Sequence, residues 1–203
     1  QQGVSVTEAI YEAGFNASSR LYENADCLLG MKPTEYRSGA AGITITYALA
    51  TSFLGPILIA ATSKGICGID LDDSPAILIE RLSARFPKAN LQEGGETFFA
   101  WVSDVLACIE QPGRSLGLPL DIRGTAFQCR VWQALRDIPP GHTMTYTQLA
   151  EQIGQPKAFR AVAKACASNQ IAIIVPCHRV IAKDKSLRGY RWGIARKQTL
   201  LAQ

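Results

Sequence analysis

The chain has 203 residues, 47% hydrophobic and 19% charged, a composition typical of a globular protein and not of a disordered or fibrous one. The net charge of +4 is unevenly divided: residues 1–122 carry 8 Lys and Arg against 14 Asp and Glu, whereas residues 123–203 carry 13 against 3. These counts give net charges of −6 and +10, which predict that only the second part meets a polyanion. A basic surface without a partner is the alternative interpretation.

The sequence also argues against several classes of protein. Its apolar stretches are shorter than the roughly 20 residues that a membrane span needs, and its N-terminus lacks the features of a secretory signal. Because the first residue is Gln and not Met, we expect a fragment or a processed product. The six cysteines form no C-x-x-C pair, and the only histidines are His142 and His178, so neither a zinc site nor a disulfide framework is expected. Isolated cysteines in apolar surroundings indicate a reducing, cytoplasmic setting.

Residues 1–38 have the pattern of short helices. The first helix is expected to end at Gly14, and Asn16 or Ser18 can cap a second one. The small residues at 38–42 indicate a linker to the next unit.

Residues 43–122 predict a small α+β unit. Period-2 alternation and β-rich composition indicate strands, and apolar residues at helical spacing indicate helices. The expected elements are strands at 43–49, 56–61, 65–71 and 118–122, a helix that begins at Pro75 after a cap at Asp73 or Ser74, and a helix around 98–109. The apolar stripe of the second helix indicates core packing and not a cofactor site.

The basic part begins with a predicted amphipathic helix at 126–138, stopped by Pro139 and Pro140. Two further segments, 145–154 and 155–165, have the pattern of helix, glycine turn, helix. Thr145 or Thr147 can cap the first of these helices, and Pro156 suits the first turn of the second.

The second helix of this pair carries a cationic stripe. Lys157, Arg160 and Lys164 recur at helical spacing, on the side opposite Phe159 and Val162. Many helical hairpins bind nothing, but the stripe favours contact with nucleic acid.

A thiol and a histidine follow an apolar run. Residues 172–175 predict a buried strand ended by Pro176, after which Cys177, His178 and Arg179 are displayed. Neighbouring cationic groups are expected to lower the thiol pKa below its usual value of roughly 8.5. Consecutive extended residues point to opposite faces, so His178 reaches Cys177 only if the backbone turns there or through a water. Taken alone, a core cysteine beside a solvated His-Arg pair is the simpler interpretation.

The segment Pro176-Cys177-His178-Arg179-Val180 resembles the active-site signature of the O6-alkylguanine-DNA alkyltransferases. The resemblance covers nearly all of residues 40–203 and continues through Phe127, Val131, Trp132, Leu135, Ile138, Pro139, Gly141, Thr143, Thr145, Tyr146, Leu149, Ala150, Arg160, Ala161, Val162, Asn169, Gly189 and Tyr190.

The resemblance implies an α/β (α+β) chain. A small ribonuclease H-like α/β domain, residues 39–122, is followed by a mainly helical, winged helix-turn-helix-like catalytic domain, residues 123–203. Separately, residues 1–38 resemble the last helices of an AraC-type DNA-binding domain, in segments such as Ala13-Gly14-Phe15-Asn16. Such a tail should not read a DNA sequence alone.

The resemblance further implies repair of DNA by direct reversal. The alkyl group of O6-methylguanine, or of O4-methylthymine, passes irreversibly to Cys177, once per molecule and without a cofactor or metal. His178 is expected to act through a water as general base, and Tyr146 to rotate the target phosphate and help protonate the leaving guanine. Asn169 resembles the hinge between the helix pair and the active-site segment.

The same resemblance assigns the DNA and substrate contacts. Arg160 is expected to fill the space left by the extruded nucleotide, with Lys157, Ala161 and Lys164 beside it on the DNA. The expected partner is double-stranded DNA carrying O6-alkylguanine, bound by a monomer in the minor groove. The predicted substrate pocket consists of the Val175 carbonyl, Tyr190 and Trp192.

Two positions depart from the family pattern. A family glutamate that completes the relay follows a Leu-Leu-Ala-x stretch, and here that stretch, Leu200–Gln203, ends the sequence. If the glutamate were truly missing, His178 would lose its orienting partner. Trp192 stands where many relatives have glycine, which predicts a smaller pocket that favours methyl over bulky groups.

Two other functions remain as alternatives. The first is a DNA-binding regulatory fragment whose transfer chemistry is vestigial. The second is an unrelated cysteine hydrolase, which the sequence disfavours because no matching His/Asn pair or oxyanion motif stands out.

Overall fold

The computed structural model describes residues 42–187 and 189–203, so the helices expected within 1–38 lie outside the described residues. The first half contains β1 (Thr44–Ser52), β2 (Gly55–Thr62), β3 (Gly65–Leu71), α4 (Pro75–Arg85), β4 (Asn90–Glu93) and α5 (Glu96–Glu110). The second half contains α6 (Ala126–Arg136), β5 (Met144–Thr145), α7 (Tyr146–Gln152), the 3-10 turn η1 (Pro156–Ala158), α8 (Phe159–Ala167), the 3-10 turn η2 (Cys177–Arg179), β6 (Val180–Ile181) and α9 (Ile194–Leu201). The predicted fold class, a sheet unit followed by a mainly helical unit, is confirmed.

The sheet of the first half has the strand order β3-β2-β1-β4. β1, β2 and β3 form two successive antiparallel hairpins, and β4 returns parallel to β1 after helix α4. The hairpin between β2 and β3 ends at Gly65, whose φ of +145° favours glycine. A side chain there would also collide with the carbonyl of Pro119, because the backbone leading to the second half passes directly against this turn.

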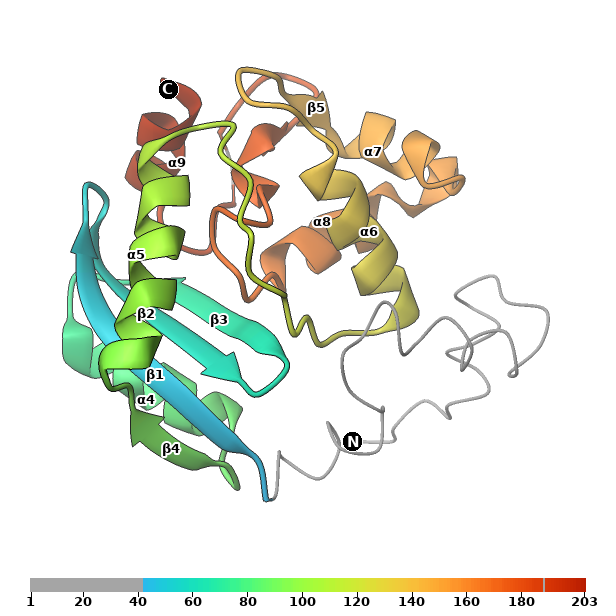
Figure 1. The fold of residues 1–203 in the computed structure, drawn as a ribbon. Coiled ribbons are helices and arrows are strands. Elements are labelled where there is room, and N and C mark those ends of the chain that lie inside the picture. The colour runs from blue at the N-terminus through green and yellow to red at the C-terminus, as the bar shows by residue number, and fades with distance from the viewer. Residues whose placement is uncertain (1–41, 188) are drawn as a thin grey trace.

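Alternating residues of the strands form two cores. Leu58 and Ala60 of β2 face α4, whereas Ile57 and Ile59 face α5 and the second half. Figure 1 shows α4 and α5 on opposite sides of the sheet, with the helices of the second half gathered beside it. The sheet is therefore buried on both faces, which explains the nearly continuous apolar run of β2.

Of the two caps predicted for the helix at 145–154, Thr145 is confirmed. Thr145 caps α7, and its hydroxyl accepts from the N–H of Gln148 while the Gln148 side chain accepts from the N–H of Thr145. Thr125 and Gln128 form the same reciprocal box at the start of α6. These caps fix where α6 and α7 begin, and the Trp132 indole then donates to Ala165 O at 2.9 Å, which joins α6 to α8.

Two predicted strands are wrong. Residues 172–175 form turns and a bend, with Ile173 at a φ of +69°, and the nearby pairing consists of a single bridge between Ile69 and Ile171. The run at 118–122 likewise contributes only one bridge, between Leu120 and Ile66. An apolar run indicates that its residues are buried but does not determine their backbone conformation. At 172–175, side-chain hydrogen bonds hold the buried turn.

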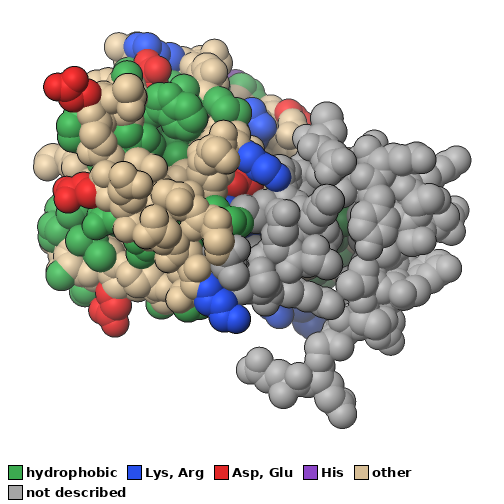
Figure 2. Space-filling view, turned by 60° about the horizontal axis from the view of Figure 1, so that its bottom comes forward, with side chains coloured by type: hydrophobic (Ala, Val, Ile, Leu, Met, Phe, Trp, Pro, Cys, Tyr) green, Lys and Arg blue, Asp and Glu red, His purple; other side chains and the backbone are tan. Residues whose placement is uncertain are grey.

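On the coloured part of the face in Figure 2, acidic and basic side chains are scattered among apolar and polar ones. Of the helices that the structure describes between residues 42 and 203, none has the length and apolar character needed to span a bilayer.

Candidate active site

Cys177 lies in a tight turn and not at the end of a strand. It begins η2, and its N–H donates to the carbonyl of Val175 at 2.8 Å. The side chains of Cys177 and His178 are both buried, at 6% and 2% exposure. The backbone therefore turns at the cysteine, which is the condition under which these two neighbours can serve one site.

Asn169 connects the end of α8 to the thiol. Its Nδ2 donates to the carbonyl oxygens of Val175 at 2.8 Å and Ile171 at 3.3 Å, and to Sγ of Cys177 at 3.3 Å. Its Oδ1 accepts from the N–H of Ile171 at 2.9 Å, which fixes the end of the amide that faces the sulfur. These bonds support the expectation that Asn169 acts as a hinge, and they also hold the buried turn at 171–175.

The expectation of a low pKa for Cys177 is wrong. Burial raises the pKa of this thiol to about 11, although the hydrogen bond from Asn169 and the charge of Lys197 act in the opposite direction. The sequence showed the nearby cations but not the loss of hydration, which is the larger effect. At neutral pH the thiol is therefore protonated.

His178 is a neutral imidazole at physiological pH. Burial, with the charges of Arg179 and Lys197, lowers its pKa to about 3. Within the described part of the chain, its Nδ1 is buried and has no hydrogen-bond partner. A neutral imidazole can accept a proton, and the unsatisfied Nδ1 is the atom at which an orienting acceptor is expected.

Sequence reasoning missed Lys197. This residue of α9 is fully buried, and its Nζ donates to the carbonyl of Val180 at 2.7 Å. Burial lowers the pKa of Lys197, whereas the cysteines at 166 and 177 act in the opposite direction. The sequence could have indicated this burial, because Lys197 precedes Leu200 by three residues and therefore shares the core-facing side of the helix.

Two tyrosines provide hydroxyl groups near the thiol. Tyr146 is the first residue of α7, and burial, followed by the proximity of Cys166 and Cys177, raises its pKa to about 12. Tyr190 is 8% exposed, and burial raises its pKa well above the ordinary value. Both phenols are protonated at neutral pH and can donate a hydrogen bond or a proton.

The other predicted pocket residues have partners within the protein. The carbonyl oxygen of Val175 already accepts hydrogen bonds from both Asn169 and Cys177. A guanine that donates to this oxygen would have to share it with those two donors. The Trp192 indole donates to Asp70 at 2.5 Å, and its ring meets the Tyr190 ring edge-on at 5.2 Å. Trp192 therefore lies between Tyr190 and β3.

The predicted DNA-contacting side chains are exposed around α8. Arg160, Ala161 and Lys164 lie on the helix, whereas Lys157 lies in η1, so the continuous helix expected at 155–165 is wrong at its start. The prediction that Phe159 lies on the side opposite the cationic stripe is also wrong. Its side chain is 42% exposed, and the Arg160 guanidinium lies 5.7 Å from its ring centre. The opposite side of α8 is buried through Val162, as expected.

The remaining thiols are structural in character. Like Cys177, the cysteines at 67, 108, 129 and 166 are free and buried. Burial raises the pKa of Cys67 to about 11 and of Cys129 to about 12. Across residues 42–187 and 189–203, the His, Cys, Asp and Glu side chains form no group of three that could hold a metal ion.

Two family models match the halves of this chain. The model described as "6-O-methylguanine DNA methyltransferase, ribonuclease-like domain" matches residues 45–122, and "6-O-methylguanine DNA methyltransferase, DNA binding domain" matches residues 126–203. The chain belongs to the 6-O-methylguanine DNA methyltransferase family. The resemblance inferred from the Pro-Cys-His-Arg-Val segment is thus confirmed.

Curated relatives and solved structures agree with this family. The chain is 51% identical over 200 residues to "Bifunctional transcriptional activator/DNA repair enzyme Ada" of Escherichia coli strain K12, covering 98% of this chain and 56% of the relative. It is 38% identical over 144 residues to "Methylated-DNA--protein-cysteine methyltransferase, inducible" of Bacillus subtilis, covering 70% and 80%. The crystal structure of Mycobacterium tuberculosis OGT in complex with DNA matches with a TM-score of 0.63 at 36% identity, covering 77% and 91%.

The chain spans little more than half the length of its Escherichia coli relative. The family models match residues 45–122 and 126–203, and the thiol, the histidine and the helix pair lie in the second of these ranges.

Proposed function

We propose that this chain repairs DNA by transferring the alkyl group of O6-methylguanine, and of O4-methylthymine, irreversibly to Cys177. The observation that carries the proposal is the hydrogen bond from Asn169 to the buried thiol, at the end of a helix whose exposed side is cationic. The partner is double-stranded DNA containing the alkylated base. A monomer that works in the cytoplasm stays a prediction.

The first step is extrusion of the damaged nucleotide. The O6 atom lies inside the duplex, whereas Cys177 is buried in the protein, so the base must leave the helical stack to reach the thiol. Arg160 is exposed on the first turn of α8, where its guanidinium can occupy the vacated space. Lys157 and Lys164 flank it and are suited to contact phosphates.

The second step is transfer. The thiol proton passes to His178, the Sγ–carbon bond of Cys177 forms as the O6–carbon bond breaks, and the electron pair of the broken bond remains on guanine. Tyr146 then donates its proton to the guanine, and the proton that left the thiol replaces it. The raised pKa of Tyr146 keeps this donor protonated at neutral pH. A thioether has no easy reverse reaction, so each chain acts once.

The low pKa of His178 and the high pKa of Cys177 oppose the proton transfer in this step. A carboxylate at Nδ1 would stabilise the imidazolium and favour the transfer. The glutamate expected directly after Gln203 in the family pattern would supply such a group. A chain with glutamate at the position after Gln203 should therefore transfer faster than one with glutamine at that position.

The decisive test is incubation with a duplex oligonucleotide that carries a single isotope-labelled O6-methylguanine. We expect one labelled methyl group per chain, on the peptide that contains Cys177, and no further turnover. Cys177→Ala should abolish labelling and retain DNA binding, whereas Cys166→Ala should retain both. Retained binding without any label in the unmutated chain would instead favour the regulatory alternative.

A second measurement separates extrusion from chemistry. Arg160→Ala should slow the repair of duplex DNA but leave the reaction with the free base O6-methylguanine nearly unchanged, because the free base needs no extrusion. Unchanged duplex repair by Arg160→Ala would contradict the role assigned to this arginine.

A further inference from the structure

The segment Tyr190-Arg191-Trp192 joins the candidate active site to the sheet of the first half. We propose that Asp70 of β3 is a positioning residue for alkyl transfer: its carboxylate holds Trp192, and Trp192 holds the Tyr190 side of the substrate pocket. The inference rests on the proposed function and assigns a role in catalysis to the first half of the chain.

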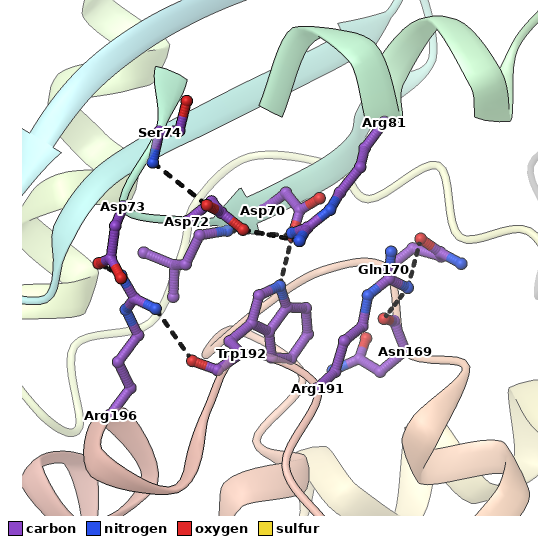
Figure 3. A network of polar contacts seen from close by, with 11 residues as sticks. Asp70, Asp72, Asp73, Ser74, Arg81, Asn169, Gln170, Arg191, Trp192 and Arg196 are labelled. Carbon is purple, nitrogen blue, oxygen red and sulfur yellow. Dashed lines mark hydrogen bonds and ion pairs between the residues drawn. The ribbon is translucent and has the colours of Figure 1, made fainter. Parts of the chain in front are cut away.

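The contact between Asp70 and Trp192 is a hydrogen bond to a charged group. Oδ1 of Asp70 accepts from the indole Nε1 at 2.5 Å, and the Trp192 side chain is 3% exposed. Arg81 of α4 lies 3.8 Å from the same oxygen and makes an ion pair with Asp72 at 2.6 Å, which restrains the carboxylate from the other side (Figure 3). Charged hydrogen bonds are roughly twice as strong as neutral ones, so the indole orientation is well defined.

Two ring contacts carry this orientation to the histidine. Trp192 meets Tyr190 at 5.2 Å between ring centres with an interplanar angle of 66°, and Tyr190 meets His178 at 6.4 Å and 83°. Edge-to-face pairs have preferred geometries, and all three rings are buried. A displaced indole therefore allows the Tyr190 ring, which the family resemblance assigns to the substrate pocket, to shift.

Arg191 provides a second connection from the same segment. Its guanidinium donates to the carbonyl of Asn169 at 3.2 Å and to the Gln170 side chain at 3.0 Å (Figure 3). Asn169 in turn donates to Sγ of Cys177. Both the pocket side and the thiol thus depend on where residues 190–192 lie.

Asp73 offers a matched control for Asp70. It also joins the two halves, through an ion pair with Arg196 of α9 at 2.5 Å. Its side chain is 94% exposed, and Arg196 keeps hydrogen bonds to the carbonyls of Leu54 and Trp192 without it. Asp73→Ala therefore removes a contact between the halves and leaves the indole in place.

The experiment measures single-turnover transfer with two substrates, the free bases O6-methylguanine and O6-benzylguanine. Asp70→Ala should slow methyl transfer about tenfold, since displacement of a positioning group reduces the population aligned for reaction. It should also change the ratio of the methyl and benzyl rates, because the side of the pocket moves. Asp73→Ala should leave both the rate and the ratio unchanged, and Asp70→Asn, which keeps an acceptor oxygen, should lose less than Asp70→Ala.

Trp192→Phe provides an independent test, because it removes the indole donor and keeps an aromatic ring. Asp70→Ala in the Trp192→Phe background should cost no further rate, which is the coupling expected of one shared hydrogen bond. Equal effects of Asp70→Ala and Asp73→Ala, or an unchanged methyl-to-benzyl ratio, would overturn the inference. Absence of transfer by the unmutated chain would instead contradict the proposed function.

Discussion

Removal of the hydrogen bond between Asn169 and Cys177 should raise the already high pKa of the thiol. Asn169→Ala deletes the Nδ2 group that donates to Sγ at 3.3 Å. A hydrogen bond to a charged group contributes about 1.5–3 kcal/mol, and one pKa unit corresponds to about 1.4 kcal/mol. The pKa should therefore rise by about one to two units, which reduces the thiolate fraction at pH 8 by roughly 10- to 100-fold.

The assay follows the alkylation of Cys177 by iodoacetamide, quantified by mass spectrometry of the peptide, between pH 7 and pH 10. Because the thiolate is the reactive form, the rate in the unmutated protein should rise about tenfold per pH unit without levelling off. In Asn169→Ala the profile should have the same slope and lie lower throughout. Trp132→Phe removes a different buried hydrogen bond to α8 and serves as the control for a general loss of stability.

Either of two results would refute this reasoning. A rate that levels off below pH 9 in the unmutated protein would show that burial does not dominate the thiol pKa. Superimposable profiles for Asn169→Ala and the unmutated protein would show that the bond to Sγ does not stabilise the thiolate.

Three further predictions concern the histidine, the cationic surface and the pocket. The pKa of His178 is about 3 in the folded chain and near 6.5 in the unfolded chain. The free energy of unfolding is therefore highest above pH 6.5 and should decrease by roughly 5 kcal/mol as the pH falls towards 3, because the unfolded chain binds the proton first. Urea unfolding should show this loss, and His178→Gln should flatten it; equal stability at pH 7.5 and pH 4 would contradict the prediction. Lys157→Ala and Lys164→Ala should each lower the slope of log affinity for DNA against log salt by about 0.9, and an unchanged slope in a titration would exclude a phosphate contact. Trp192→Gly should raise the ratio of the O6-benzylguanine rate to the O6-methylguanine rate, because the pocket widens, and should slow methyl transfer, because Tyr190 loses its support; equal rates for both substrates in the unmutated chain would remove the basis for a narrow pocket.

The sequence predicts the elements whose signals are local. The cap candidate Thr145 and the helical spacing of Phe98 and Val105 correctly predict α7 and α5. The Pro-Cys-His-Arg-Val segment likewise predicts the family. Each of these features depends on residues close together in the chain.

The features that sequence reasoning missed depend on which side chains meet after folding, whether those residues are neighbours in the chain or distant from each other. The turn at 171–175 exists because the Asn169 side chain replaces the backbone partners of a strand. The raised pKa of Cys177 follows from burial in a core that includes residues of both halves, and the orientation of Trp192 follows from a carboxylate 122 residues away. The composition of a short segment does not show which side chains will contact it in the folded protein.

The main hydrophobic core does not follow the change of charge near residue 122. It includes Ile57 and Ile69 of the sheet together with Trp132 and Cys177 of the second half. Residues that share one core tend to unfold in one cooperative transition, so the thiol and the strands are expected to lose their structure together. If each chain acts once, as proposed, a destabilising substitution in the sheet would reduce the number of repair events in direct proportion to the folded fraction, with no turnover to compensate.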